Sequence, residues 1–131
     1  MILARREFLM AIGGAAAWVR PALAAPAWRA GVASIDITPQ PGLWMAGFAA
    51  RKGPSQGVAL PLHAKALALV DARGRRAVIV TLDLLGLTGP VVDRVAAAVE
   101  RRHGISRDRL LLCSSHTHSG PVIDDQLAVA Y

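Results

Sequence analysis

The sequence predicts an incomplete α/β domain with a mixed sheet, built from an N-terminal strand, a β-hairpin and a βαβ unit. Three observations carry this prediction. Apolar and polar residues alternate with a period of two over residues 28–38. Two β-rich runs, 62–71 and 76–84, flank a short turn. A helical pattern then leads into a short apolar run that begins at Leu110.

The first strand is expected to be half-buried. Its alternation places Ala33, Ile35 and Ile37 on one face, and Pro39 to Gly42 end it. Residues 43–62 keep no period and form a long connection, which is typical of a functional loop or of a disordered one. Its apolar residues either pack over a cleft or pin the loop to the core; they are Trp44, Met45 and Phe48.

The hairpin turn is predicted at residues 72–75, where Gly74 supplies a positive φ. Its second strand is continuously apolar over residues 77–82, as a central strand should be, and ends at Asp83.

The helix is predicted to begin after Thr88, which is suited to the N-cap, with Pro90 in the first turn. Valines at 91, 92, 95 and 99 form one apolar stripe, and His103 with Gly104 closes the helix. The run at Leu110 is then expected to be a parallel strand buried on both faces, reached by a right-handed crossover.

Residues 1–24 resemble a twin-arginine export signal rather than a part of the fold. Arg5 and Arg6 precede an apolar run, and Ala22-Leu23-Ala24 offers a cleavage site. The sequence therefore predicts an exported protein, periplasmic or extracellular, whose mature chain covers residues 25–131. An uncleaved N-terminal anchor is the alternative.

Charge and cysteine content exclude other classes. The net charge is +6, but the arginines are scattered and lack an interleaved aromatic platform, so a solvated surface is favoured and a nucleic-acid partner is not expected. The single cysteine, Cys113, lies in the apolar run, which favours a buried small hydrophobe over a reactive thiol or a metal ligand.

Two histidines directly follow the last strand. His116 and His118 leave the carboxyl edge of the parallel strands, and Asp83 leaves the same edge. Imidazole is a common metal ligand and a proton carrier at physiological pH, so this edge is the candidate catalytic or metal site. The alternative is that the histidines only satisfy backbone groups, and that Asp83 only caps a turn or orients a histidine. Metallo-β-lactamase-like hydrolases also use a strand-end His-x-His, but they require an aspartate where this chain has Gly120.

Four motifs together resemble the N-terminal part of the neutral/alkaline, non-lysosomal ceramidase family. In order along the chain they are Asp36-Ile37-Thr38-Pro39, Met45-Ala46-Gly47-Phe48, Thr81-Leu82-Asp83-Leu84 and Ser115-His116-Thr117-His118-Ser119-Gly120-Pro121. The resemblance implies a zinc-dependent amidase that hydrolyses the N-acyl bond of ceramide or a related lipid amide. A membrane surface is one place where the enzyme would encounter this substrate.

The resemblance also implies roles for particular residues. His116 corresponds to a zinc ligand, and His118 to a histidine beside the metal that contacts the reacting group. We assign Asp83 to the same catalytic edge, and His63 to a strand without a ligand role. In the family the other ligands, a second histidine, a glutamate and a tyrosine, come from later in the chain. We therefore expect a fragment that is inactive alone, or else a truncated relative that binds metal or lipid without catalysis.

Overall fold

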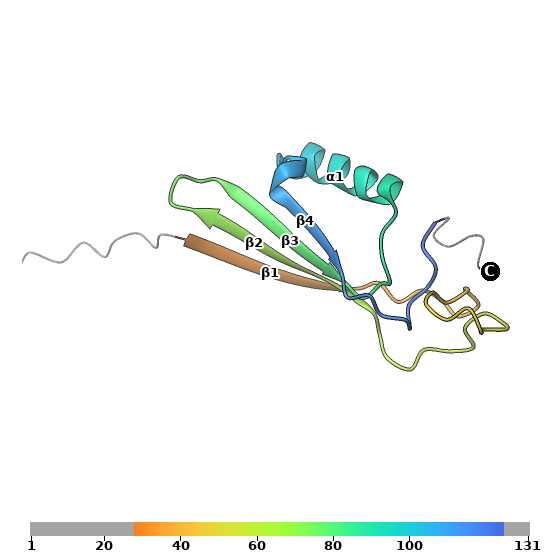
Figure 1. Cartoon of the computed structure of the whole chain (residues 1–131). Coiled ribbons are helices and arrows are strands. Elements are labelled where there is room, and N and C mark those ends of the chain that lie inside the picture. The colour runs from red at the N-terminus through yellow and green to blue at the C-terminus, as the bar shows by residue number, and fades with distance from the viewer. Residues whose placement is uncertain (1–27, 125–131) are drawn as a thin grey trace, which may run out of the picture.

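The computed structural model describes residues 28–124 as a four-stranded sheet with one helix, which confirms the predicted class (Figure 1). The elements are β1 (Trp28–Asp36), β2 (His63–Asp71), β3 (Arg76–Leu82), α1 (Gly89–His103), the short 3-10 helix η1 (Arg107–Arg109) and β4 (Leu110–Ser114). The predicted export signal at residues 1–24 lies outside the described residues.

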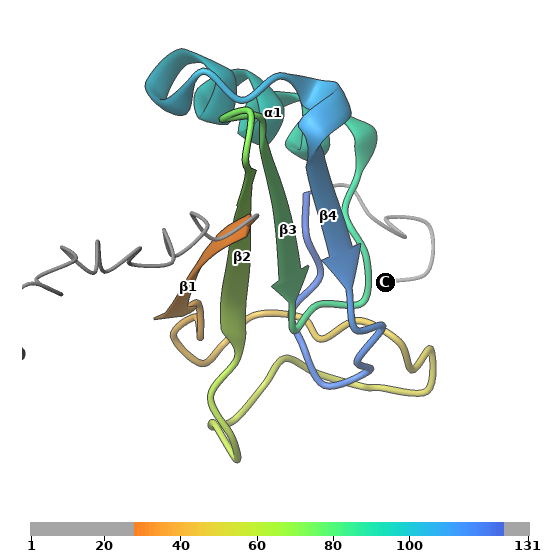
Figure 2. The same cartoon turned by 90° about the vertical axis from the view of Figure 1, so that its left-hand side faces the viewer.

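The strands lie in the order β1-β2-β3-β4, so neighbours in sequence are neighbours in the sheet (Figure 2). β1 pairs antiparallel with β2, and β2 pairs antiparallel with β3. β3 and β4 are parallel, with α1 in the connection between them, so the βαβ unit is confirmed. The connection of residues 37–62 and the segment after β4 gather at one end of the sheet (Figure 1).

The hairpin turn between β2 and β3 is fixed by Asp71. Gly74 has φ 77°, as predicted, and its N–H donates to the Asp71 carbonyl at 3.0 Å. The Asp71 carboxylate accepts from the backbone N–H groups of Arg73 and Arg75, and from Arg75 Nε at 2.6 Å. These donors, the Arg75 side chain above all, hold the pKa of Asp71 below its ordinary value.

The ends of α1 agree with the sequence except at the cap. Gly104 ends the helix with φ 62°, and its N–H donates to the Glu100 carbonyl at 2.8 Å. Thr88 stands at the N-cap but makes no side-chain capping bond. Its hydroxyl lies 3.3 Å from Asp124 Oδ2 instead, so the predicted cap is right in place and wrong in hydrogen bonding.

Burial is lower than predicted in both outer strands. β1 is exposed along its whole length, with Val32 at 84% and Ile35 at 65%, so the prediction of a half-buried strand is wrong. In β4, Leu110 is buried but Leu111 is 53% exposed, so the prediction of burial on both faces is also wrong. The reason is that α1, the only long helix within residues 28–124, lies on the β3–β4 side of the sheet, so β1 and the opposite face have no helix over them (Figure 1). Cys113 is accordingly half-buried rather than buried.

The uncovered face carries an apolar row that runs across all four strands. The register aligns Val32 with Leu67, Leu67 with Ile79, and Ile79 with Leu111. The alternate residues of these strands, such as Val78 and Leu110, line a cavity of about 810 Å³ between the sheet and the valine stripe of α1. Since side chains alternate along a strand, the apolar row lies on the opposite face.

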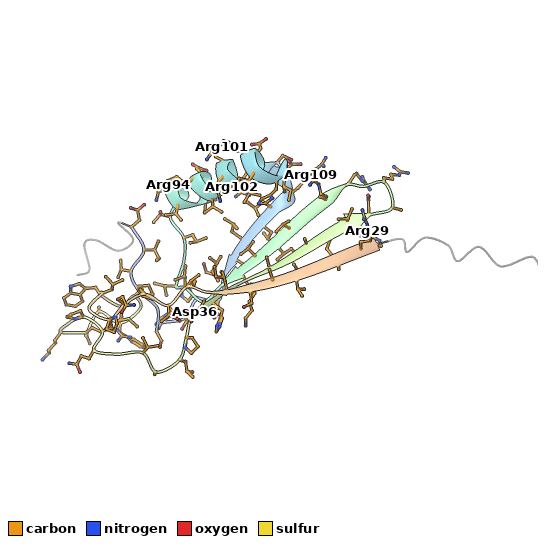
Figure 3. The ribbon with its side chains drawn as sticks, turned by 180° about the vertical axis from the view of Figure 1, so that it is seen from behind. Arg29, Asp36, Arg94, Arg101, Arg102 and Arg109 are labelled. Carbon is orange, nitrogen blue, oxygen red and sulfur yellow. The ribbon has the colours of Figure 1, made fainter. Side chains whose placement is uncertain are left out.

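The exposed cations are distributed over several elements. Figure 3 shows Arg94, Arg101 and Arg102 on α1, and Arg29 at the end of β1 remote from Asp36. All four arginines are exposed. In residues 28–124 no helix has both the length and the apolar character needed to span a membrane.

Candidate functional site at the carboxyl edge of the sheet

β3 and β4 end side by side, as the sequence predicted. Asp83 N–H donates to the His63 carbonyl at 3.0 Å, and Ser115 N–H donates to the Leu82 carbonyl at 2.9 Å. These bonds continue the ladder one residue beyond each strand. The residues that follow, Asp83 on one side and the His-x-His segment on the other, are therefore placed by the sheet itself.

His116 has a conformation that presents one ring nitrogen. Its φ is 59°, in the left-handed region that non-glycine residues seldom occupy. Its Nδ1 lies 2.9 Å from the carbonyl oxygen of buried Leu85. A carbonyl oxygen only accepts, so this hydrogen bond requires a proton on Nδ1. In the neutral ring the lone pair then stands on Nε2, which is the arrangement of a metal-ligating histidine whose other nitrogen is fixed by a backbone carbonyl.

The His118 ring lies between two other rings. Its centroid is 5.2 Å from that of His116, with an interplanar angle of 64°, and 5.1 Å from that of Phe48, at 75°. Both contacts are edge-to-face, the arrangement that aromatic rings prefer. The two histidines of the motif thus stand together, and the long connection contributes a third ring.

The long connection is joined to the His-x-His segment through the main chain. Ala46 N–H donates to the Gly120 carbonyl and Val122 N–H donates to the Trp44 carbonyl, both at 2.9 Å. Met45 and Pro121 form a bridge between these two bonds, and Ala46 is fully buried. The connection is therefore joined to the segment by its main chain rather than by its aromatic side chains, since Trp44 is 41% and Phe48 52% exposed, while Met45 lines the cavity at this edge.

Arg51 is a residue of this site that the sequence analysis missed. Its Nη2 donates to the His118 carbonyl at 2.8 Å, and its guanidinium carbon lies 5.2 Å from the Phe48 ring centroid. Its Nε is buried and has no hydrogen-bond partner. No sequence pattern links Arg51 to a residue 67 positions away, and only the neighbouring Met45-Ala46-Gly47-Phe48 motif pointed to this stretch.

Asp83 reaches the predicted edge but faces a different neighbour. Its Oδ2 accepts from the His63 backbone N–H at 2.9 Å. It also lines a cavity of about 690 Å³, whose wall on the His-x-His segment consists of Ser115, Thr117 and Ser119. Neither imidazole lines this cavity. The alternation of the segment thus separates the hydroxyl side chains near Asp83 from the two histidines.

Two other predicted positions have structural roles. His63 begins β2 and is held through its main chain by Asp83, in agreement with its prediction as a strand residue. Asp36 closes β1, because its Oδ1 accepts from Thr38 N–H at 2.7 Å. The Thr38 hydroxyl and amide hold the pKa of Asp36 below its ordinary value. The Thr38 hydroxyl in turn accepts from Leu62 N–H at 2.8 Å, which ties the two ends of the long connection together.

The described residues include a suitable zinc ligand but too few ligands in one place to hold a zinc ion. His116 offers Nε2, a good ligand atom for zinc. Within residues 28–124, however, no three His, Cys, Asp or Glu side chains are grouped closely enough to hold a metal ion. A zinc site at this edge needs further ligands from outside this part of the chain.

The fold is that of a partial α/β domain whose strand-end histidine pair makes a candidate metal-binding edge. Residues 28–127 match the family described as neutral/alkaline non-lysosomal ceramidase, N-terminal, and the chain belongs to this family. No curated protein sequence matches the chain.

Two solved structures are similar to this chain. One is the neutral ceramidase of Pseudomonas aeruginosa, with 29% identity and a TM-score of 0.66 over 72% of this chain and 16% of that one. The other is described as ceramidase complexed with C2, with 29% identity and a TM-score of 0.67 over 72% of this chain and 15% of that one. The chain thus spans about a sixth of the length of these relatives.

Proposed function

We propose that the chain forms one wall of the active site of an exported, zinc-dependent amidase, which hydrolyses the N-acyl bond of ceramide or of a related lipid amide. The observation that carries this proposal is the hydrogen bond of 2.9 Å between His116 Nδ1 and the Leu85 carbonyl. It leaves Nε2 as the ligand atom, at the position where the family resemblance places a zinc ligand. Family membership and the similarity to two ceramidase structures support the choice of reaction.

His116 would hold the metal together with ligands from outside the described residues. When bound, zinc supplies a Lewis acid that polarises a carbonyl and lowers the pKa of bound water toward neutrality. The ring centroid of His118 is 5.2 Å from that of His116, so His118 would be near such a metal and would donate a hydrogen bond to a reacting group or transfer a proton. Because three or four protein ligands are needed, we propose that residues 25–131 alone are inactive.

The role of Asp83 in this proposal is to shape the site from the side of the cavity. Its carboxylate fixes the His63 amide, and β2 and β3 are thereby held together at the edge from which the site emerges. A direct catalytic role for Asp83 would require it to touch the substrate through the cavity that it lines.

A lipid substrate is supported by the apolar residues around the cavity. Val58 and Leu60 line it and are 52% and 79% exposed. Apolar side chains exposed beside a cavity are suited to contact an acyl chain, since burial of each CH₂ contributes about 0.8 kcal/mol. These exposed apolar side chains would meet a lipid amide at a membrane surface.

The zinc content and the amidase activity of the native gene product test this function together. We expect retained zinc and release of fatty acid from a lipid amide, and both should be lost in His116→Ala. His103→Ala is the matched control, because His103 ends α1 and is exposed there. Activity retained in His116→Ala would overturn the ligand assignment.

The 131-residue chain alone should retain no stoichiometric zinc after a mild chelator wash, because the described residues hold too few ligands in one place. Stoichiometric zinc in this chain would show that its own side chains close the site. Export is tested separately by cell fractionation. The double substitution Arg5→Lys and Arg6→Lys should keep the protein in the cytoplasm.

A further inference from the structure

We propose that Gly47, Phe48 and Arg51 are positioning residues for His118, so that the long connection holds the imidazole in its working orientation. This inference rests on the proposed function for its catalytic meaning. Its geometric content stands on this structure alone, since each of the three residues has a direct contact with His118.

Gly47 forms the closest of these contacts. A Cβ atom added at this position would lie 2.5 Å from His118 Cγ, 2.6 Å from Cβ and 2.8 Å from Nδ1. Such distances are shorter than any van der Waals contact, so any side chain here would displace the imidazole or the loop. Only glycine at position 47 allows the loop backbone to lie this close to the His118 ring. Its φ of 101° adds a second reason for glycine at this position.

Phe48 and Arg51 hold the ring and the backbone of His118 separately. The Phe48 ring meets the imidazole edge-to-face at 5.1 Å, and Arg51 Nη2 donates to the His118 carbonyl at 2.8 Å. The guanidinium also lies 5.2 Å from the Phe48 centroid, so the two side chains support each other. Arg51 keeps this position although its buried Nε has no partner.

The structure offers a matched pair of glycines for the test. Gly42 has φ 102°, almost the same as Gly47, but an added Cβ would meet nothing within 4 Å. Gly42→Ala thus introduces the backbone strain without the overlap with His118, and Gly47→Ala introduces both. The difference between the two variants isolates the contact with the imidazole.

The first readout is the ¹H–¹³C spectrum of the histidine rings in the full 131-residue chain, which needs no activity. We expect the His118 ring signals to shift in Gly47→Ala and to keep their wild-type positions in Gly42→Ala. Should Gly47→Ala fail to fold, Arg51→Gln provides a second test, because it removes the hydrogen bond to the His118 carbonyl and keeps the Phe48 ring. Unshifted His118 signals in the folded variants would overturn the proposal.

The second readout is steady-state hydrolysis of a lipid amide by the native gene product. Because misplacement of a reacting group by about 1 Å costs on the order of 10²-fold in rate, Gly47→Ala should lose about that factor in kcat with little change in KM. Arg51→Gln should also lower kcat, and Arg51→Lys should restore part of it. Lys52→Gln, which changes the exposed neighbour of Arg51, should leave kcat unchanged. Equal kcat in Gly47→Ala and Gly42→Ala would refute the positioning role.

The two readouts separate the inference from the function on which it rests. If the wild-type protein hydrolyses no lipid amide and the His118 signals still shift, the proposed function fails and the positioning stands. If the protein is active and the signals do not shift, the positioning fails and the function stands.

Discussion

Replacement of Asp83 by alanine should destabilise the chain measurably, because the carboxylate has a definite structural partner. Asp83 is half-buried, and its Oδ2 accepts from the His63 N–H at 2.9 Å. Hydrogen bonds to charged groups contribute about 1.5–3 kcal/mol, and Asp83→Ala leaves the His63 amide without this acceptor. We therefore expect a loss of about 2 kcal/mol in the free energy of unfolding. For a domain of this size that lowers Tm by roughly 8–16 °C.

Asp83→Asn separates the structural contribution from a catalytic one. The amide oxygen still accepts from His63, and a neutral hydrogen bond contributes about 0.5–1.5 kcal/mol against about 1.5–3 for one to a charged group, so the loss should be about 1 kcal/mol. Thermal and urea unfolding followed by circular dichroism measure both variants. If Asp83→Ala unfolds with the wild-type midpoint, the assigned hydrogen bond is not structural. If Asp83→Asn keeps its stability but loses amidase activity, the carboxylate has a catalytic role beyond its contact with His63.

Three further predictions concern the scaffold. The pKa of Asp71 is lower in the folded state than in the unfolded state, where it is near 3.8. Its contribution to stability is therefore present above pH 3.8 and is lost as pH falls through the folded-state pKa. Urea unfolding between pH 6 and pH 2 should show this loss of stability, and the loss should be smaller in Asp71→Asn. Leu110→Ala should cost about 2–5 kcal/mol and Leu111→Ala less than about 1, because Leu110 is 4% and Leu111 53% exposed; equal losses in urea unfolding would contradict the observed burial. Gly104→Ala should cost about 1–2 kcal/mol, because an L-residue is strained at φ 62°, whereas Gly89→Ala, which meets nothing within 4 Å, should be nearly neutral in the same melts.

The elements could be predicted from the sequence because their signals are local. Gly74 and Gly104 mark the hairpin turn and the helix end, and both have the positive φ that only a few residue types adopt readily. Burial could not be predicted in the same way. Val32 and Leu111 alternate or cluster as core residues do, but exposure depends on what covers the sheet, and that information is not local.

The site shows the same division between local and non-local information. His116 and His118 were predicted because they follow a strand within one short motif, and Asp83 because it ends the adjacent strand. Arg51 could not be predicted, since the hydrogen bond to His118 joins residues 67 positions apart. Nor could the sequence predict that the alternate residues Ser115, Thr117 and Ser119, and neither imidazole, line the cavity beside Asp83.

The main-chain bonds between the long connection and the His-x-His segment have a consequence for the evolution of specificity. Trp44, Ala46 and their partners meet through amide and carbonyl groups, which every residue other than proline possesses. Val58 and Leu60 take part neither in these bonds nor in the contacts of Phe48 and Arg51 with His118, so we expect substitutions there to leave the histidines in place. A library randomised at these two positions should yield variants that differ in acyl preference while they share one catalytic geometry.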